Sequence, residues 1–278
     1  MRARLRRFGL GLATLLGRPR GFFIPYRYAA ILPARPLPPL PAVERLFKRA
    51  APTMRAHLAA IERYGIDLAA IAGPAPQPRF DQDWFPTLDA ALLYALVREQ
   101  RPARILEVGS GHSTRFLARA VGDGGLTRTT IKAIDPAPRA DLGALPVTLA
   151  RRTLTEADLG RTRELSAGDM LVIDSSHILM PGSDVDLLLS RLLPELAAGV
   201  FVHLHDVFLP DDYPRAWWWR GYNEQNALVP LLLGGGYRVE FASHYVRTRL
   251  AEALQRSVVA RLPAKAGGHP ASLWLSKT

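Results

Sequence analysis

From residue 104 onward, short apolar runs alternate with segments of helical periodicity, and this alternation restricts the fold more than any other feature of the chain. Runs such as residues 171–174 are nearly continuous in apolar character, as expected for strands covered on both faces. The alternation predicts an α/β fold with a doubly wound parallel sheet. We expect strands over 104–108, 130–135, 147–150, 170–174, 200–205, 237–242 and 272–275, and helices over 114–121, 155–165, 183–196, 215–233 and 247–260.

The residues before this alternation divide into two parts. Residues 1–41 form a basic tail that ends in a Pro-rich strap at 33–41, which fits neither a helix nor the centre of a sheet. Helical patterns follow over 42–63 and 86–99. We therefore predict three parts: the tail and strap over 1–41, a helical extension over 42–100, and the α/β domain over 101–278.

Positive charge is concentrated in the tail. Residues 1–43 hold eight arginines and no acidic residue, and subtracting these eight from the net charge of +11 leaves +3 for the rest of the chain. That is too little for a surface that follows nucleic-acid phosphates, so we expect no nucleic-acid partner. Residues 1–16 are too short to span a bilayer, which takes about 20 apolar residues.

Two interpretations of the tail stay open. One is an amphipathic helix that lies on an anionic membrane surface through residues 1–20, and the other is a frayed basic tail. We expect a cytoplasmic protein, with peripheral contact at the inner membrane face under the first interpretation. The chain contains no cysteine, which excludes disulfide scaffolds, thiol nucleophiles and cysteine-ligated metals.

The loop after the first predicted strand is suited to approach a ligand. Ligands of doubly wound sheets bind beyond the carboxyl ends of the strands. Here two glycines let the backbone turn tightly, and the helix that starts near residue 114 directs free N–H groups at the ligand. The candidate ligand contacts of this loop are Glu107, Gly109, Ser110, Gly111 and His112.

Two residues distinguish between nucleotide ligands, and a third suits both. Thr114 stands where a dinucleotide-binding loop has a third Gly or Ala. Glu107 would repel a pyrophosphate, yet it suits the ammonium group of S-adenosylmethionine. Asp135, after the second predicted strand, can accept hydrogen bonds from both hydroxyls of a ribose, a role that both ligands share. The pattern therefore favours S-adenosylmethionine over NAD.

A second group of polar residues follows the fourth and fifth predicted strands. Asp174 and His177 follow the fourth strand, whereas His205 and Asp206 follow the fifth. Because the carboxyl ends of adjacent parallel strands meet at one edge, we expect these four side chains to converge over the ligand site, as catalytic groups do. His203 lies deeper in the fifth strand and is interpreted as structural.

These motifs resemble those of a known family. Residues 107–114 resemble the first motif of class I S-adenosylmethionine-dependent methyltransferases. The series Ile-Asp-Ser-Ser-His, Gly-Ser-Asp-Val, His-Asp-Val-Phe and Asn-Glu-Gln resembles a bacterial subgroup, the methyltransferase 24 or macrocin-type sugar O-methyltransferases. The segment GFFIPYRYA at 21–29 also resembles this subgroup, and the main match covers about residues 80–245.

The resemblance implies a Rossmann-like sheet of seven strands whose last strand is antiparallel, with S-adenosylmethionine as cofactor. It also implies a divalent metal such as Mg²⁺ at positions like Asp174 and Asp206. Val207 stands where those enzymes often have a second oxygen ligand, so the metal is left open. The cofactor contacts implied are Glu107, Gly109, Gly111 and Asp135, with further contacts near Arg152 and Asp174.

The activity implied is methyl transfer to a hydroxyl of a sugar, glycan or glycolipid-type acceptor. The hydroxyl proton must leave, so we expect His177 or His205 to act as base beside Asp206, with a metal as the open alternative. Asn223 and Glu224 could orient the acceptor. Two other functions stay open: a non-catalytic, membrane-associated module with this fold, and an NAD-dependent oxidoreductase. The sequence identifies neither the acceptor nor the oligomeric state.

Overall fold

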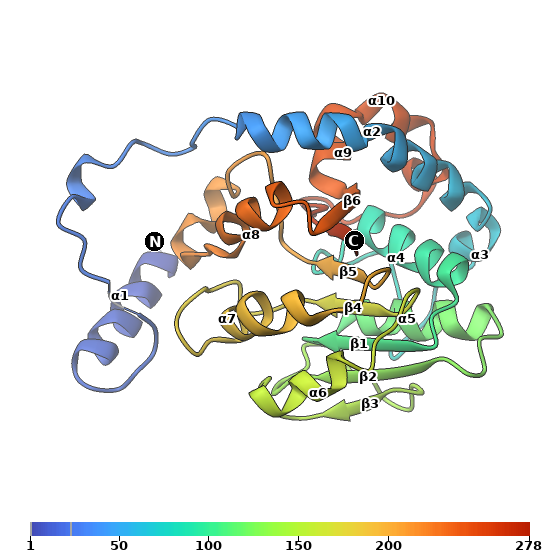
Figure 1. Cartoon of the computed structure of the whole chain (residues 1–278), viewed down its shortest axis with the longest axis horizontal. Coiled ribbons are helices and arrows are strands. Elements are labelled where there is room, and N and C mark those ends of the chain that lie inside the picture. Colours follow the sequence, from blue (N-terminus) through green and yellow to red (C-terminus); the bar gives the residue numbers. More distant parts are fainter. Residues whose placement is uncertain (1, 23) are drawn as a thin grey trace.

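A seven-stranded sheet forms the centre of the computed structural model, which describes residues 2–22 and 24–278 (Figure 1). The strand order is β3-β2-β1-β4-β5-β7-β6, and β7 runs antiparallel to both of its neighbours while β1 to β5 are parallel. The strands are β1 (Arg104–Val108), β2 (Thr130–Ile134), β3 (Thr148–Ala150), β4 (Met170–Ile173), β5 (Phe201–Leu204), β6 (Tyr237–Ala242) and β7 (Leu273–Lys277).

The predicted sheet with an antiparallel last strand is confirmed. All four residues of β4 are buried, although successive side chains point to opposite faces, so helices cover the sheet on both sides. This explains why the central strands are apolar without alternation. Each predicted strand overlaps an observed one, with ends that differ by at most two residues.

The two long helices of the extension pack on the sheet. These are α2 (Pro41–Glu62) and α4 (Thr87–Gln100), in which every residue from Thr87 to Val97 is buried. Residues of both helices belong to the same hydrophobic core as β1, β4 and β5. The division of the chain at residues 41 and 100 stays a prediction, but no separate core distinguishes 42–100 from the sheet among the described residues.

Several predicted helices are broken into short pieces. The predicted helix 215–233 splits into η5 (Arg215–Arg220) and α8 (Glu224–Leu233), because Gly221 adopts a left-handed φ of 72° that ends the first piece. The other helices are α3 (Gly65–Ala69), α5 (His112–Asp123), η2 (Glu156–Asp158), α6 (Leu159–Thr162), α7 (Asp184–Leu187), η3 (Leu188–Leu192), η4 (Leu193–Glu195), α9 (Ser243–Arg249), α10 (Ala251–Arg256) and η6 (Val258–Arg261).

The N-terminal helix α1 (Arg2–Leu15) lies away from the sheet and beside η5, and an extended strap containing η1 (Ala29–Ile31) joins it to α2 (Figure 1). Met1 of the expected membrane-contact segment and Phe23 of the GFFIPYRYA segment lie outside the described residues. In the part of the chain that the structure describes, no helix combines the length and the apolar character needed to cross a membrane.

We predict that Asp89→Ala destabilises the fold. The buried Asp89 carboxylate of α4 accepts hydrogen bonds from the backbone N–H groups of Ala271 (2.9 Å) and Ser272 (3.2 Å), just before β7. Removing it leaves two buried donors without a partner, which costs at least about 2 kcal/mol of unfolding free energy in urea denaturation. Asp81→Ala, which removes an exposed carboxylate, is the control and should change stability by less than about 0.5 kcal/mol. Equal effects of the two substitutions would contradict this role.

Candidate active site

A cleft of about 580 Å³ opens beyond the carboxyl ends of β1, β2 and β4. Gly109 and Ser110 of the first loop, Asp135 after β2 and Asp174 after β4 line it. The volume lies within the range of about 300–1,000 Å³ that small-molecule sites occupy. The structure thus brings four of the predicted site residues together where doubly wound sheets bind their ligands. We call this space the cofactor cavity.

Position 109 of the first loop can be occupied only by glycine. Its φ is +81°, and a Cβ atom at this position would lie 2.1 Å from the backbone carbonyl oxygen of Asp174. Only glycine permits this contact between the β1 loop and the end of β4. Gly111, by contrast, has no neighbouring atom closer than 4.0 Å to a built Cβ, so close packing requires glycine at only one of the two positions.

Asp135 is fixed at the wall of the cofactor cavity by the same loop. Ser110 donates its backbone N–H (2.7 Å) and its hydroxyl (2.9 Å) to Asp135 Oδ2, and the N–H of Ala137 donates to Oδ1 (2.7 Å). Each carboxylate oxygen accepts two hydrogen bonds, so Oδ1 retains capacity for a ligand. The geometry is compatible with the predicted ribose contact, which stays a prediction.

Glu107 does not lie where the sequence analysis expected it. The side chain is fully buried beneath the loop, and it is not among the residues that line the cofactor cavity. Its carboxyl oxygens accept hydrogen bonds from the hydroxyls of Ser113 and Thr114, both at 2.6 Å. Burial raises the pKa of Glu107 to about 8. Both oxygens face the start of α5, so Glu107 holds the loop in place, and its direct contact with a ligand stays a prediction.

Three further predicted cofactor positions, Gly111, His112 and Arg152, also lie outside the cavity wall. His112, the first residue of α5, is half-buried, and burial together with the charges of Arg115 and Arg79 lowers its pKa to about 4. It does not line the cofactor cavity. Arg152 forms a two-point ion pair with Asp158 (2.6 Å for each bond), while residues 153 and 154 next to it line the cavity.

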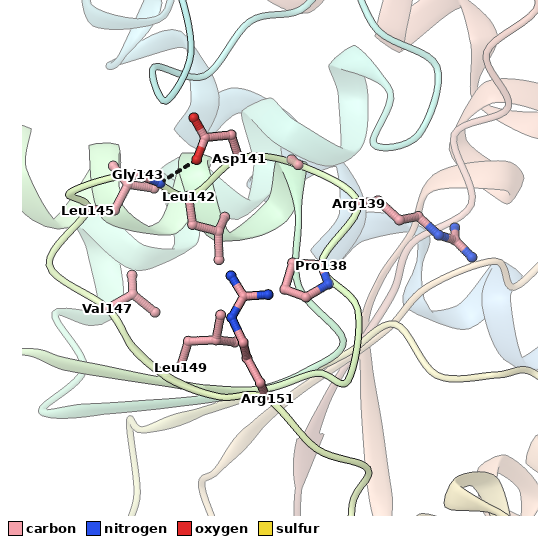
Figure 2. Close-up of a pocket in the computed structure, with 10 residues that line it drawn as sticks. Pro138, Arg139, Asp141, Leu142, Gly143, Leu145, Val147, Leu149 and Arg151 are labelled. Atoms are coloured by element: carbon pink, nitrogen blue, oxygen red, sulfur yellow. Dashed lines mark hydrogen bonds between the residues drawn. The ribbon is translucent and has the colours of Figure 1, made fainter.

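Arg139 belongs to the cofactor cavity and also to the edge of a neighbouring hollow. Figure 2 shows this second hollow, of about 390 Å³, between the loop after β2 and β3; Arg151 points into it, whereas Arg139 points away. The guanidinium carbon of Arg139 lies 4.6 Å from the centre of the Trp84 ring. This cation–π contact brings the loop after β2 against the segment before α4 at the rim of the cofactor cavity.

His177 is the centre of a buried cluster of carboxylates. Its Nδ1 lies 2.9 Å from Glu224 Oε2, and its Nε2 lies 3.3 Å from Asp174 Oδ1 and 3.4 Å from Asp206 Oδ2. The His177 side chain is 5% exposed and Glu224 only 3%, whereas Asp174, at 36%, faces the cofactor cavity. The predicted convergence of residues after β4 and β5 is therefore present.

The backbone at this cluster is strained. His177 and Asp206 have φ angles of +61° and +57°, in the left-handed region that residues other than glycine seldom adopt. The carbonyl of His177 accepts hydrogen bonds from the N–H groups of Asn223 (3.1 Å) and Glu224 (3.3 Å), which hold this turn against the start of α8. Strain of this kind, kept in place by surrounding contacts, is concentrated at functional sites.

The charges of the cluster shift the pKa values of His177 and Asp174 in opposite directions. Burial alone would lower the pKa of His177, but the hydrogen bonds to Asp174 and Glu224 and the charge of Asp206 raise this pKa well above its usual value. Although burial opposes ionisation of Asp174, the hydrogen bond from His177 and the charge of His205 hold the pKa of that carboxyl well below its usual range. An imidazolium between carboxylates is the favoured state.

His205 is placed differently from His177. Its Nε2 lies 3.0 Å from the carbonyl oxygen of Trp84 and 3.4 Å from Asp206 Oδ1, and its buried Nδ1 has no hydrogen-bond partner among the described residues. A carbonyl accepts, so Nε2 carries a proton. His205 does not line the cofactor cavity. His203 is fully buried with Nε2 2.8 Å from Ser272 Oγ, which supports the structural interpretation.

The predicted metal site is not formed. Mg²⁺ requires several oxygen ligands around one point, but Asp174 and Asp206 converge on the imidazole nitrogen of His177. Among residues 2–22 and 24–278 no group of three or more acidic, His or Cys side chains is arranged to hold a metal ion. The residues present do not fit the metal, because a cationic side chain occupies the position between the carboxylates.

The sequence analysis did not identify the roles of three groups at this site. Glu224 was expected to orient an acceptor, yet it binds His177; it also accepts hydrogen bonds from the Ser175 hydroxyl at 3.1 and 3.0 Å. Ser175 was not singled out, although it lies inside the Asp-Ser-Ser-His motif. The backbone carbonyl of Trp84 carries no sequence signal, because any residue supplies one.

A family model matches the central part of the chain. Residues 106–207 match the Methyltransf_24 model, which is described as a methyltransferase domain. This segment runs from the middle of β1 to the residue after Asp206, so it includes the first loop and both carboxylates that contact His177 Nε2. No curated protein matches the chain.

Solved structures of methyltransferases are also similar to this chain. The O-methyltransferase TomG from Streptomyces achromogenes, involved in tomaymycin synthesis and solved with SAM, is 17% identical, with 81% of this chain and 89% of that chain covered and a TM-score of 0.43. An O-methyltransferase from Bacillus cereus solved with SAH is 17% identical (80% and 91% covered, TM-score 0.36). MycE of the mycinamycin pathway, solved with Mg, SAH and mycinamycin VI, is 20% identical (65% and 47% covered, TM-score 0.35).

The seven-stranded sheet with its antiparallel last strand and the matched domain together define a class I S-adenosylmethionine-dependent methyltransferase. Within this class, residues 106–207 match the model of the Methyltransf_24 domain. The family suggested by the sequence motifs is thereby confirmed.

We predict that Glu107→Gln makes stability less dependent on pH. The Glu107 pKa is about 8 in the fold and about 4.5 ordinarily, so between these values the folded chain holds a proton that the unfolded chain has lost. Rising pH therefore lowers the free energy of unfolding, by up to about 1.4 kcal/mol per pH unit, and the substitution removes this contribution. Urea denaturation at several pH values measures it, and an unchanged pH slope in the variant would contradict the assignment.

Proposed function

We propose that this protein transfers a methyl group from S-adenosylmethionine to a hydroxyl oxygen of a small-molecule or glycan-type acceptor. The observation that carries the proposal is the position of the His177 cluster at the edge of the cofactor cavity, with Asp174 belonging to both. A donor site and a strong base that share one residue are what O-methylation of an alcohol requires.

The cofactor cavity supplies contacts for each part of the donor. Asp135 is available to the ribose, and Gly109 and Ser110 offer a glycine turn next to the start of α5. Asp174 is a cavity carboxylate that suits the ammonium of the methionine part, the role first expected of Glu107. When bound, S-adenosylmethionine supplies a sulfonium methyl that is already activated, so the protein mainly aligns the acceptor and excludes water.

We assign the base to His177. The base is the neutral form of His177, which has lost the proton on Nε2. The three surrounding carboxylates make this form the minor one, and they stabilise the imidazolium that is produced when His177 takes the proton of the alcohol. Glu224 holds Nδ1, so Nε2 is the nitrogen available as the base. His177 does not itself line the cofactor cavity, but its Nε2 contacts Asp174, which does. The proton leaves the acceptor hydroxyl for Nε2 as the oxygen attacks the methyl group. His205 supports Asp206 and bonds to Trp84.

The aromatic residues after β5 favour a ring-bearing acceptor. The Tyr222 ring lies 4.6 Å from the His177 ring, and Trp217 and Arg220 also pack against Tyr222. Aromatic faces of this kind suit a sugar ring, and Tyr222 and Trp217 are only half-buried. A sugar or glycolipid-type acceptor is therefore the class that we propose.

Peripheral membrane contact at the inner face of the cytoplasmic membrane is part of the proposal. On α1 one apolar stripe, formed by Leu5, Phe8 and Leu12 and continued by Leu16, is 65, 70, 46 and 75% exposed. No acidic residue precedes Glu44. Exposed apolar side chains on a basic helix suit an anionic lipid surface.

We expect S-adenosylmethionine, and not NAD, to bind. Asp135→Ala should weaken the binding of S-adenosylmethionine by about tenfold or more, because a carboxylate that accepts hydrogen bonds from the ligand is lost. Isothermal calorimetry measures both ligands. Asp141→Ala, in the neighbouring loop outside the cofactor cavity, is the matched control and should bind as the native chain does. Binding of NAD alone would favour an oxidoreductase, and binding of neither would favour a non-catalytic module.

We expect His177→Gln to reduce methyl transfer by about 100-fold or more while the affinity for S-adenosylmethionine is retained, because only the base is lost. Label transfer from radiolabelled S-adenosylmethionine into fractionated cell extract measures the rate, and calorimetry measures the affinity. His205→Gln is the comparison and should reduce the rate much less at equal folded fraction. The reverse order of the two effects would assign the base to His205.

A further inference from the structure

A separate cavity, of about 520 Å³, lies between the N-terminal residues and the segment that follows His177. One wall consists of residues of α1 and of the turn after it, up to Ile24. The other wall consists of Ile178 and Met180 after β4, together with residues 219–221 and Asn223 at the junction of η5 and α8. We call it the arm cavity, and we call residues 5–22 and 24 the arm.

The arm cavity adjoins the catalytic cluster through the backbone. Ile178 directly follows His177, and Asn223 directly precedes Glu224. Asn223 Oδ1 accepts a hydrogen bond from the N–H of Leu179 (2.7 Å), so the two parts of this wall are joined to each other. The wall of the arm cavity and the two residues of the His177–Glu224 pair are therefore one continuous structure.

One face of α1 is directed at this cavity. The α1 residues that line it are Arg7, Leu10, Gly11, Thr14 and Leu15, spaced three and four apart as on one side of a helix. The turn after α1 is fixed because the N–H of Arg20 donates to Thr14 Oγ1 (3.1 Å). The stripe assigned above to membrane contact, which begins with Leu5 and Phe8, does not line the cavity.

The strap keeps the arm at this place. Arg35 Nε donates to Asp212 Oδ2 (2.8 Å), the N–H of Leu37 donates to the same oxygen (3.2 Å), and the Arg35 guanidinium lies 5.0 Å from the Trp218 ring centre. The N–H of Leu40 donates to the carbonyl of Pro210 (2.8 Å). These contacts hold the strap to the segment between β5 and η5, next to the arm cavity.

The cavity lining is apolar with a positive rim. Its charged residues are Arg7, Arg20 and Arg220, and the described residues that line it include no carboxylate. Its apolar side chains are Leu10, Leu15, Phe22, Ile24, Ile178, Met180 and Trp219. Such a lining is complementary to a molecule with an apolar chain and an anionic group.

We propose that the arm cavity is the acceptor site and that the acceptor is an anionic amphiphile: an apolar chain lies along α1, and a phosphate-like or carboxylate group contacts the arginines. This rests on the proposed function. Ile178 and Asn223 of the lining are the chain neighbours of His177 and Glu224, so an acceptor bound here lies next to the base. The arm is then a specificity-determining part of the enzyme.

The binding test uses three probes with the same chain, namely dodecyl phosphate, dodecanol and dodecyltrimethylammonium, each below its micelle concentration. We expect dodecyl phosphate to bind most tightly and the trimethylammonium compound least tightly in calorimetry. Gly11→Trp should abolish the binding of dodecyl phosphate because the indole fills the cavity, whereas Gly9→Trp, on the same helix but outside the lining, should not. Both glycines have open space at a built Cβ, so the pair is matched.

The charge contribution has its own matched pair. Arg20→Ala should weaken dodecyl phosphate binding by about tenfold or more, and Arg18→Ala, which is outside the lining, should leave it unchanged. Dodecyl phosphate should also inhibit label transfer to the acceptor fraction of the extract, and Gly11→Trp should abolish that transfer while S-adenosylmethionine still binds.

Three results would overturn the inference: equal effects of the two glycine substitutions, binding of the cationic probe as tight as that of the phosphate, or binding of phosphatidylglycerol vesicles without binding of monomeric dodecyl phosphate. Each leaves the proposed function standing as long as S-adenosylmethionine binds. Absence of S-adenosylmethionine binding by the native chain would instead overturn the proposed function itself.

Discussion

The approach of Gly109 to the backbone of Asp174 is the constraint on which the rest of the site depends. A side chain at this position would collide with the Asp174 carbonyl. The loop after β1 can therefore lie against the end of β4 only if residue 109 is glycine. From this contact the site extends in two directions. Ser110 fixes Asp135 on one side, and Asp174 contacts His177 on the other. The Gly109 contact thereby fixes the position of the cofactor cavity relative to His177.

Opposite charges are paired within the cluster. One imidazole is in contact with three carboxylates, supplied after β4, after β5 and at the start of α8. A lone buried charge would be costly, but the carboxylates favour the imidazolium form of His177, and His177 in turn favours the ionised form of Asp174. The same arrangement explains why two residues keep left-handed backbone angles in a well-packed region. Contacts from three elements determine their position.

The sequence predicted the sheet from the alternation of apolar runs and helical segments. It also predicted that acidic residues and histidines converge. The polar residues after β4 and β5 had to meet once those strands were adjacent and parallel. It could not predict which way Glu107 points, since this depends on the hydroxyls of Ser113 and Thr114 one turn into α5. Nor could it predict the imidazole between the two carboxylates of the possible metal site, because the left-handed turn at His177 places the ring between Asp174 and Asp206.

The strap has a consequence for the order in which the molecule is assembled. Arg35 and Asp212 are 177 residues apart in the chain, so the anchor of the N-terminal helix is made only after β5 has joined the sheet. Contacts of such long range form late, because the intervening chain must first be ordered. During synthesis, α1 therefore stays without this anchor until the segment after β5 has been made, and the arm cavity is enclosed late in folding.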